Sequence, residues 1–129
     1  MKIYIETIPH HRQRYPTVGD YWEDNGVDQV RVSEMKDWRY EVLVAVHELV
    51  EMVLTRQRGI AEEAITEFDI GFEESREKQL VKGEPGDHPH SPYRREHFFA
   101  TNLERLLAAE LGVDWFEYDQ YVDALGIKK

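Results

Sequence analysis

Apolar and polar positions alternate in the first part of the chain, and this alternation predicts strands. Residues 2–8 form one alternating run, and residues 18–24 and 27–33 form two more that flank Asn25-Gly26. An Asn-Gly pair supplies the two positive φ angles that a type I′ turn requires. We therefore expect residues 1–35 to form a small antiparallel β-sheet with a hairpin at Asn25-Gly26.

Beyond the predicted sheet, the apolar positions recur with a helical period. The pattern predicts three helices and a short terminal helix, over residues 38–58, 60–80, 91–111 and 114–126. Asp37 is suited to cap the first helix, Ser91-Pro92 to open the third, and Asp114 with Glu117 to cap the last. Residues 81–92 form a polar loop rich in Gly and Pro, which we expect to be mobile and able to act as a lid.

These elements predict a single α+β domain over residues 1–129. Its N-terminal antiparallel sheet (residues 1–35) is expected to pack on a helical region (residues 37–126) made of a three-helix bundle and a short C-terminal helix. A chain of this length can bury one hydrophobic core. No repeat or linker divides it.

The first predicted helix is apolar nearly all round, so other elements should cover it. His47 and Glu51 lie one helical turn apart on it, and Glu48 lies about 100° from His47, at the border of the apolar surface. Burying an imidazole and a carboxylate is costly unless they are paired, protonated or bound to a metal. The pattern H-E-x-x-E therefore indicates a metal site or an acid–base site.

The other two long helices also carry ionisable residues on apolar faces. Asp69 lies beside the apolar stripe of the second helix, and Glu96 lies on that of the third, with His97 about 100° farther round. Carboxylates from facing helices are the usual way in which a helical bundle builds a metal centre. We expect His47 and Glu51 to be metal ligands together with Glu96 or His97, and Asp69 to be a further ligand or to orient one.

Each of these residues also has an ordinary structural explanation. A single histidine on an apolar face is more often a hydrogen-bonded core residue than a ligand, Asp69 can bond locally, and Glu51 or Glu96 can form a buried ion pair with an arginine. The arginines available for such a pair are Arg39, Arg94, Arg95 and Arg105. Several carboxylates in one small core would each be costly without compensation, and this cost favours a shared metal or catalytic site.

The charge and composition of the chain argue against several classes of function. The sequence has 26 acidic and 16 basic residues and a formal charge of −10, which disfavours binding to nucleic acid or to an anionic membrane. It has no cysteine, so a metal ion would be held by His, Asp or Glu. It contains no signal-peptide pattern and no run of about 18 apolar residues, and we expect a cytoplasmic protein.

The H-E-L-V-E motif of residues 47–51 resembles the zinc-binding helix of the zincin metallopeptidases, in which H-E-x-x-H follows a strand and a later helix adds a ligand. The resemblance implies His47 as the first ligand, Glu48 as the general base and Glu51 in place of the second histidine, with a third-helix residue as the later ligand. Because an acidic ligand set also suits Mn²⁺ or Mg²⁺, we expect zinc first and these ions as alternatives.

A second resemblance is to the all-α NTP pyrophosphatases, whose E-x-x-E and E-x-x-D motifs hold Mg²⁺ against a nucleotide phosphate. Glu48 and Glu51 match the first motif, whereas Thr66 stands three residues before Asp69, where the second motif has Glu. In length and composition the chain is also similar to small phage or prophage proteins of unknown function.

The sequence therefore predicts a divalent-metal-binding protein, in its catalytic version a zincin-like metal-dependent hydrolase that acts on a small molecule or a peptide. The alternatives are a non-enzymatic interaction or structural protein with a buried His–carboxylate cluster, and a Mg²⁺-dependent nucleotide pyrophosphohydrolase. Aromatic residues near the C-terminus offer a homodimer contact, but we favour their packing onto the bundle. They are Trp115, Phe116, Tyr118 and Tyr121.

Overall fold

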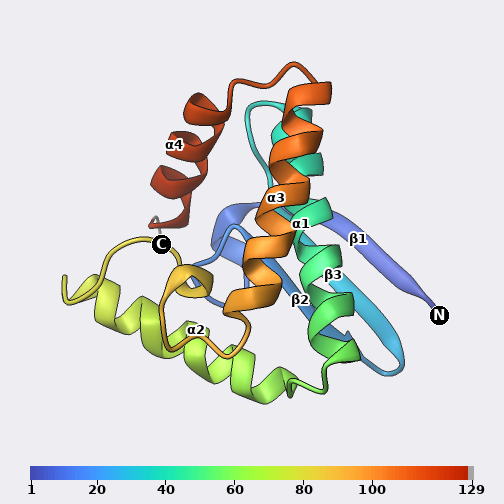
Figure 1. Ribbon diagram of the computed structural model, residues 1–129, viewed down its shortest axis with the longest axis vertical. Coiled ribbons are helices and arrows are strands. Elements are labelled where there is room, and N and C mark those ends of the chain that lie inside the picture. Colours follow the sequence, from blue (N-terminus) through green and yellow to red (C-terminus); the bar gives the residue numbers. More distant parts are fainter. Residues whose placement is uncertain (128–129) are drawn as a thin grey trace.

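The computed structural model describes residues 1–127 and has a three-stranded sheet followed by four helices (Figure 1). The strands are β1 (Ile3–Ile8), β2 (Gly19–Asp24) and β3 (Val27–Ser33), and the helices are α1 (Trp38–Gln57), α2 (Glu62–Glu77), α3 (Arg94–Glu110) and α4 (Trp115–Gly126). Two short 3-10 helices, η1 (His10–Arg12) and η2 (Pro85–Asp87), lie in the connections. The predicted α+β class is confirmed.

The sheet has the strand order β1-β3-β2 and is mixed. β2 and β3 pair antiparallel around Asn25 and Gly26, whose φ angles of 51° and 78° confirm the predicted hairpin. The expectation of a wholly antiparallel sheet is wrong for β1, which pairs parallel with β3. After β1, the chain forms β2 at the opposite edge of the sheet. The strand β3 then lies between β1 and β2 and runs parallel to β1. Alternation along a strand does not reveal this order of neighbours.

Most helix ends follow the predicted caps. The Asp37 carboxylate accepts a hydrogen bond from the Arg39 N–H at 2.9 Å, and that of Asp114 accepts one from the Glu117 N–H at 3.0 Å. The predicted start of the third helix at Ser91-Pro92 is wrong, because α3 begins at Arg94. The Ser91 hydroxyl instead accepts from the Tyr93 N–H inside the preceding turn.

The helix α1 is the centre of the fold, as its apolar surface predicts. It contacts β2 and β3 on one side and α3 on another (Figure 1). Leu43 on α1 and Val30 on β3 are fully buried between these layers. Figure 1 shows α2 crossing the ends of α1 and α3 instead of running beside them, so the helical layer is less regular than a parallel bundle.

The last helix packs on this core through its aromatic residues. The Tyr118 ring lies 5.1 Å from that of Tyr40 and 5.4 Å from that of Trp115, and Tyr121 lies 5.4 Å from Tyr40. This is the favoured interpretation of the C-terminal aromatic residues, although Phe116 remains exposed. Within residues 1–127, no helix has both the length and the apolar character needed to cross a bilayer.

Candidate metal centre

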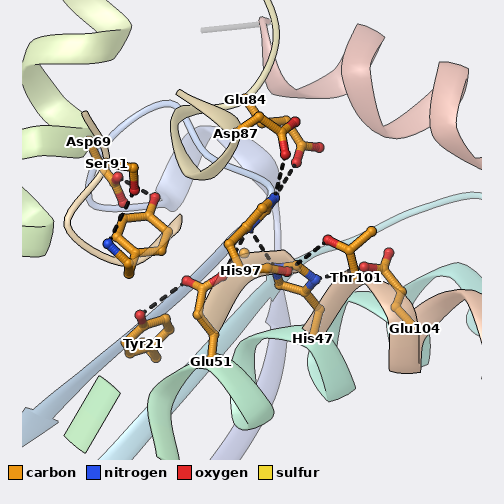
Figure 2. A network of polar contacts seen from close by, with 12 residues as sticks. Tyr21, His47, Glu51, Asp69, Glu84, Asp87, Ser91, His97, Thr101 and Glu104 are labelled. Carbon is orange, nitrogen blue, oxygen red and sulfur yellow. Dashed lines mark hydrogen bonds and ion pairs between the residues drawn. The ribbon is translucent and has the colours of Figure 1, made fainter. Parts of the chain in front are cut away.

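Three side chains from α1 and α3 converge on one point in the interior (Figure 2). His47 Nε2 lies 2.9 Å from Glu51 Oε2, His97 Nδ1 lies 3.0 Å from the same oxygen, and the two ring nitrogens are 3.1 Å apart. All three side chains are buried. This group could hold a metal ion.

The helices bring these residues together for simple reasons. His47 and Glu51 are four residues apart on α1, so their side chains lie one above the other on the same face. His97 projects from α3, which packs directly against α1. Ala100, one turn after His97, is fully buried, and its small side chain suits this close packing of the two helices.

Carboxylates face the remaining nitrogen of each histidine. His47 Nδ1 lies 2.7 Å from Glu104 Oε1, and His97 Nε2 lies 3.3 Å from Glu84 and 3.2 Å from Asp87. Metal-binding histidines almost always carry such a partner, because it fixes the tautomer and turns the other nitrogen towards the ion. The environment of both rings therefore matches that of metal ligands.

Two tyrosines hold the carboxylates in turn. The Tyr21 hydroxyl donates to Glu51 Oε1 at 3.0 Å, which leaves Oε2 facing the two histidines. The Tyr118 hydroxyl donates to Glu104 Oε2, and thereby fixes the carboxylate that orients His47. The arrangement thus extends from β2, across α1 and α3, to α4.

The spacing of the three inner atoms suits a metal ion. A Zn²⁺ ion binds imidazole nitrogen and carboxylate oxygen at about 2.0–2.2 Å. At such bond lengths, adjacent ligands are separated by about 3.0 Å in octahedral and about 3.4 Å in tetrahedral geometry. The observed separations of 2.9–3.1 Å lie close to this range, so the residues fit an ion with little rearrangement.

In the absence of an ion, the same groups form buried ion pairs. Burial would raise the pKa of Glu51, but hydrogen bonds from His47 and His97 outweigh burial and lower it to about 2. Burial would lower the pKa of His97, but the carboxylates of Asp87, Glu51 and Glu84 raise it to about 12. The pKa of His47 is likewise raised, against the effect of burial, by Glu104 and Glu51. In the metal-free cluster each buried imidazolium is therefore paired with carboxylates.

Glu48 lies beside this cluster and lines a cavity of about 120 Å³ that the ligands also line. Its carboxylate lies against the backbone of Gly19, where a Cβ atom would be 2.5 Å from Glu48 Oε1. Burial, together with the charge of Glu51, raises its pKa well above the usual value. Among the described residues, nothing hydrogen-bonds the Glu48 carboxylate.

The structure separates the other two candidate carboxylates from the ligand group. Glu96 pairs with Arg58 at 2.7 Å, so His97 is the α3 residue that meets His47 and Glu51. Asp69 lines the cavity but lies outside the group of three, where it accepts hydrogen bonds from the Tyr15 hydroxyl at 3.1 Å and the Tyr93 hydroxyl at 2.5 Å.

Several residues of the site were missed from the sequence. Glu104 lies two turns after His97 and therefore on the same face of α3, a signal that was available. Glu84 and Asp87 belong to the loop that was expected to be mobile. In the structure this loop packs on the site, since a Cβ atom at Gly86 would lie 2.4 Å from His97 Nδ1. With His97 Nε2, the two loop carboxylates form a second, more exposed group that could hold an ion.

The environment of Asp69 predicts an unusual pH dependence of stability. Burial raises its pKa from 3.8 to about 7, although hydrogen bonds from Tyr93 and Tyr15 lower it. The folded state therefore binds this proton more tightly than the unfolded state, and stability falls as the pH rises from about 4 to 7. We expect Asp69→Asn to remove this loss of stability, which amounts to as much as about 4 kcal/mol of unfolding free energy at pH 7.

Urea unfolding in the presence of a chelator, repeated between pH 4 and pH 8, measures the effect. The unfolding free energy of Asp69→Asn, relative to that of the unmodified chain, should increase as the pH rises. The exposed Asp24→Asn provides a control that should show no such trend. A difference that does not vary with pH would contradict the assigned pKa of Asp69.

No protein-family model matches the chain, and searches of curated proteins and of solved structures found no significant match.

Proposed function

We propose that this chain binds one divalent metal ion through His47 Nε2, His97 Nδ1 and Glu51 Oε2 and uses it to hydrolyse a substrate. One observation carries the proposal: these atoms lie within 3.1 Å of one another, while the other nitrogen of each histidine faces a carboxylate. If His47 Nε2 and His97 Nδ1 were both protonated at this separation, they would repel each other. If both instead point a lone pair at one metal ion, each is attracted to that ion. Zinc is preferred, because two imidazoles and one carboxylate are the ligands of catalytic zinc in several peptidases, with Mn²⁺ or Mg²⁺ as alternatives.

Glu48 is the general base in this proposal. A bound Zn²⁺ ion lowers the pKa of a coordinated water molecule to about 7. Glu48 lines the same cavity as the ligands and has no hydrogen-bonding partner among the described residues, so its carboxylate is free to accept a proton. Burial and the charge of Glu51 raise its pKa, which makes it a stronger base than an ordinary glutamate. This is the role that the zincin resemblance implies for Glu48.

The pyrophosphohydrolase alternative has less support. Arg76 is the only lysine or arginine that lines the cavity within residues 1–127, and both oxygens of Glu73 already bind it at 2.5 Å. A nucleotide substrate would bring further negative charge into a cavity whose lining includes eight carboxylates. We therefore favour a small-molecule or peptide substrate that lacks phosphate groups.

A purely structural role is the second candidate, and one observation favours it. Without an ion, both histidines are held as cations by carboxylates, so neither buried imidazolium lacks a partner. Such a network can fix a unique arrangement of α1 against α3. This candidate gives no function to the free carboxylate of Glu48 or to the cavity beside it, which is why we rank it second.

Metal binding is the first prediction of this proposal. The purified chain should bind about one Zn²⁺ ion, measured by elemental analysis and by competition with a chelating dye. A ligand that binds only the native state stabilises that state, so Zn²⁺ should also raise the Tm. His97→Ala should weaken zinc binding by at least about 100-fold, since it removes one of three ligands.

His90→Ala is the matched control, because His90 is an exposed histidine in the loop before α3 and lies outside the ligand group. The zinc affinity of this variant should equal that of the unmodified chain. A protein that contains no metal, and whose Tm is unchanged by Zn²⁺ and by Mn²⁺, would leave only the structural role.

The second prediction concerns Glu48. The zinc-loaded chain should hydrolyse at least one member of a panel of aminoacyl p-nitroanilides. Glu48→Gln should lower kcat by about 10²–10⁴-fold, the usual contribution of a general base, and should retain zinc.

The exposed Glu63→Gln should keep full activity in the same assay. Loss of zinc from Glu48→Gln would make Glu48 a ligand, and full activity in that variant would exclude it as the base.

A further inference from the structure

One side of α1 is apolar but has little cover within the chain. The main contacts of α1 are with β2, β3 and α3. On its remaining side Trp38 is 64% exposed, and Val42 and Val53 are each 37% exposed. Apolar residues follow one another along this side at intervals of three or four positions, the spacing of a single helix face. They are Trp38, Val42, Val46, Leu49 and Val53. Such a stripe is typical of a helix that packs against another element.

The helix α3 runs antiparallel beside α1 (Figure 1). At one end of the pair, Arg58 directly after α1 binds Glu96 in the first turn of α3. At the other end, Arg39 in the first turn of α1 donates to the carbonyl oxygen of Leu111, directly after α3. The two helices therefore share one seam along most of their length, and this seam has two sides.

The metal centre lies on one side of the seam, because both histidine ligands point there (Figure 2). Val46 and Leu103 each come one position before a residue of the site and point about 100° away from it. In antiparallel neighbours the same step backwards turns to the same side of the seam, and both side chains are half-buried there. Phe99 and Leu106 lie farther round on α3 and are 51% and 66% exposed. The stripes of α1 and α3 thus join into one surface opposite the metal centre, which we call the α1–α3 apolar face.

The size of the α1–α3 apolar face suits an interface between proteins. The 17 residues of α3 span about 25 Å, and two packed helices are about 20 Å wide. This outline of about 500 Å² matches the largest apolar patches that monomers expose, which are often interaction sites. Side-chain relief increases it towards the area of about 800 Å² that each partner contributes to a standard interface.

Two opposite charges lie at the two ends of this face on α3. Arg95 is four residues before Phe99, and Glu110 is four residues after Leu106, so all four side chains lie along one line. Both charged residues are exposed, and within residues 1–127 neither forms an ion pair. Each also lies at the end of the helix whose dipole disfavours its charge, since the N-terminus is positive and the C-terminus negative. A partner that places a carboxylate beside Arg95 and a cation beside Glu110 relieves both.

We propose that the chain forms a twofold symmetric dimer through the α1–α3 apolar face. A twofold axis that crosses α3 midway between Arg95 and Glu110 makes α3 antiparallel to α3 of the second copy. Arg95 of each copy then faces Glu110 of the other, and Phe99 faces Leu106, so the surface is complementary to itself. The two helix pairs form a four-helix bundle. The proposal is independent of the metal, which lies on the other side of the seam.

Sedimentation equilibrium of the full chain tests the dimer. The chain should exchange between a monomer of 15.3 kDa and a dimer of twice that mass, both with zinc and with a chelator. Leu106→Glu should raise the Kd of the dimer at least about 30-fold, because it places an unpaired charge in the apolar centre of the interface. Phe116→Glu is the matched control, since Phe116 is an exposed apolar residue on α4, outside this face. Its Kd should equal that of the unmodified chain.

Reversing the two charges tests the twofold arrangement. Arg95→Glu and Glu110→Arg should each raise the Kd at least about tenfold at low salt, because each variant brings like charges together twice across the interface. An equimolar mixture of the two variants should form a heterodimer with a Kd within about threefold of the unmodified value, since both pairs are then opposite in charge. Native mass spectrometry separates this heterodimer from the homodimers by mass.

Three results would overturn the proposal. They are a chain that stays monomeric throughout the micromolar and millimolar range, a dimer whose Kd is unchanged by Leu106→Glu or is raised equally by Phe116→Glu, and a mixture of the two charge variants that does not associate. The first result would assign the face to a different protein. Far-UV circular dichroism shows that each variant is folded, so a loss of association is not a loss of structure.

Discussion

The sharing of one carboxylate oxygen by two buried imidazoles is the constraint on which the rest of the site depends. Glu51 Oε2 lies 2.9 Å from His47 and 3.0 Å from His97, and charged or strongly polar groups are stable in such an interior only when every remaining polar atom is also satisfied. The surrounding elements provide these partners. The Tyr21 hydroxyl on β2 donates to Glu51, and the Tyr118 hydroxyl on α4 donates to Glu104. The loop before α3 brings Glu84 and Asp87 beside His97 Nε2. The cluster therefore ties together segments that are distant in the sequence.

Two states of this cluster explain how one arrangement can serve either stability or chemistry. Without an ion, the histidines are cations paired with carboxylates; with an ion, the same nitrogens become ligands and release their protons. The second state gives a role to two features that the first leaves unexplained, namely the close approach of two ring nitrogens and the free carboxylate of Glu48 beside a cavity.

Local patterns predicted those parts of the fold and of the site that lie within one element. The spacing of His47 and Glu51 placed both on one face of a helix, and Asn25-Gly26 fixed the hairpin. Long-range choices were not predictable in this way. The parallel pairing of β1 depends on which strand it meets, and the choice between Glu96 and His97 depends on Arg58, which neutralises Glu96 from the end of α1. The roles of Glu84 and Asp87 depend on a loop that folds back over His97, a contact that no periodicity reveals.

The most direct test of the account is the position of an ion in crystals of the zinc-loaded protein, located by anomalous diffraction at the zinc absorption edge. We expect one strong site at about 2.0–2.2 Å from His47 Nε2, His97 Nδ1 and Glu51 Oε2, the bond lengths of zinc with these ligands. Zinc bound only at His97 Nε2 between Glu84 and Asp87, or no ordered zinc within reach of His47, would contradict it.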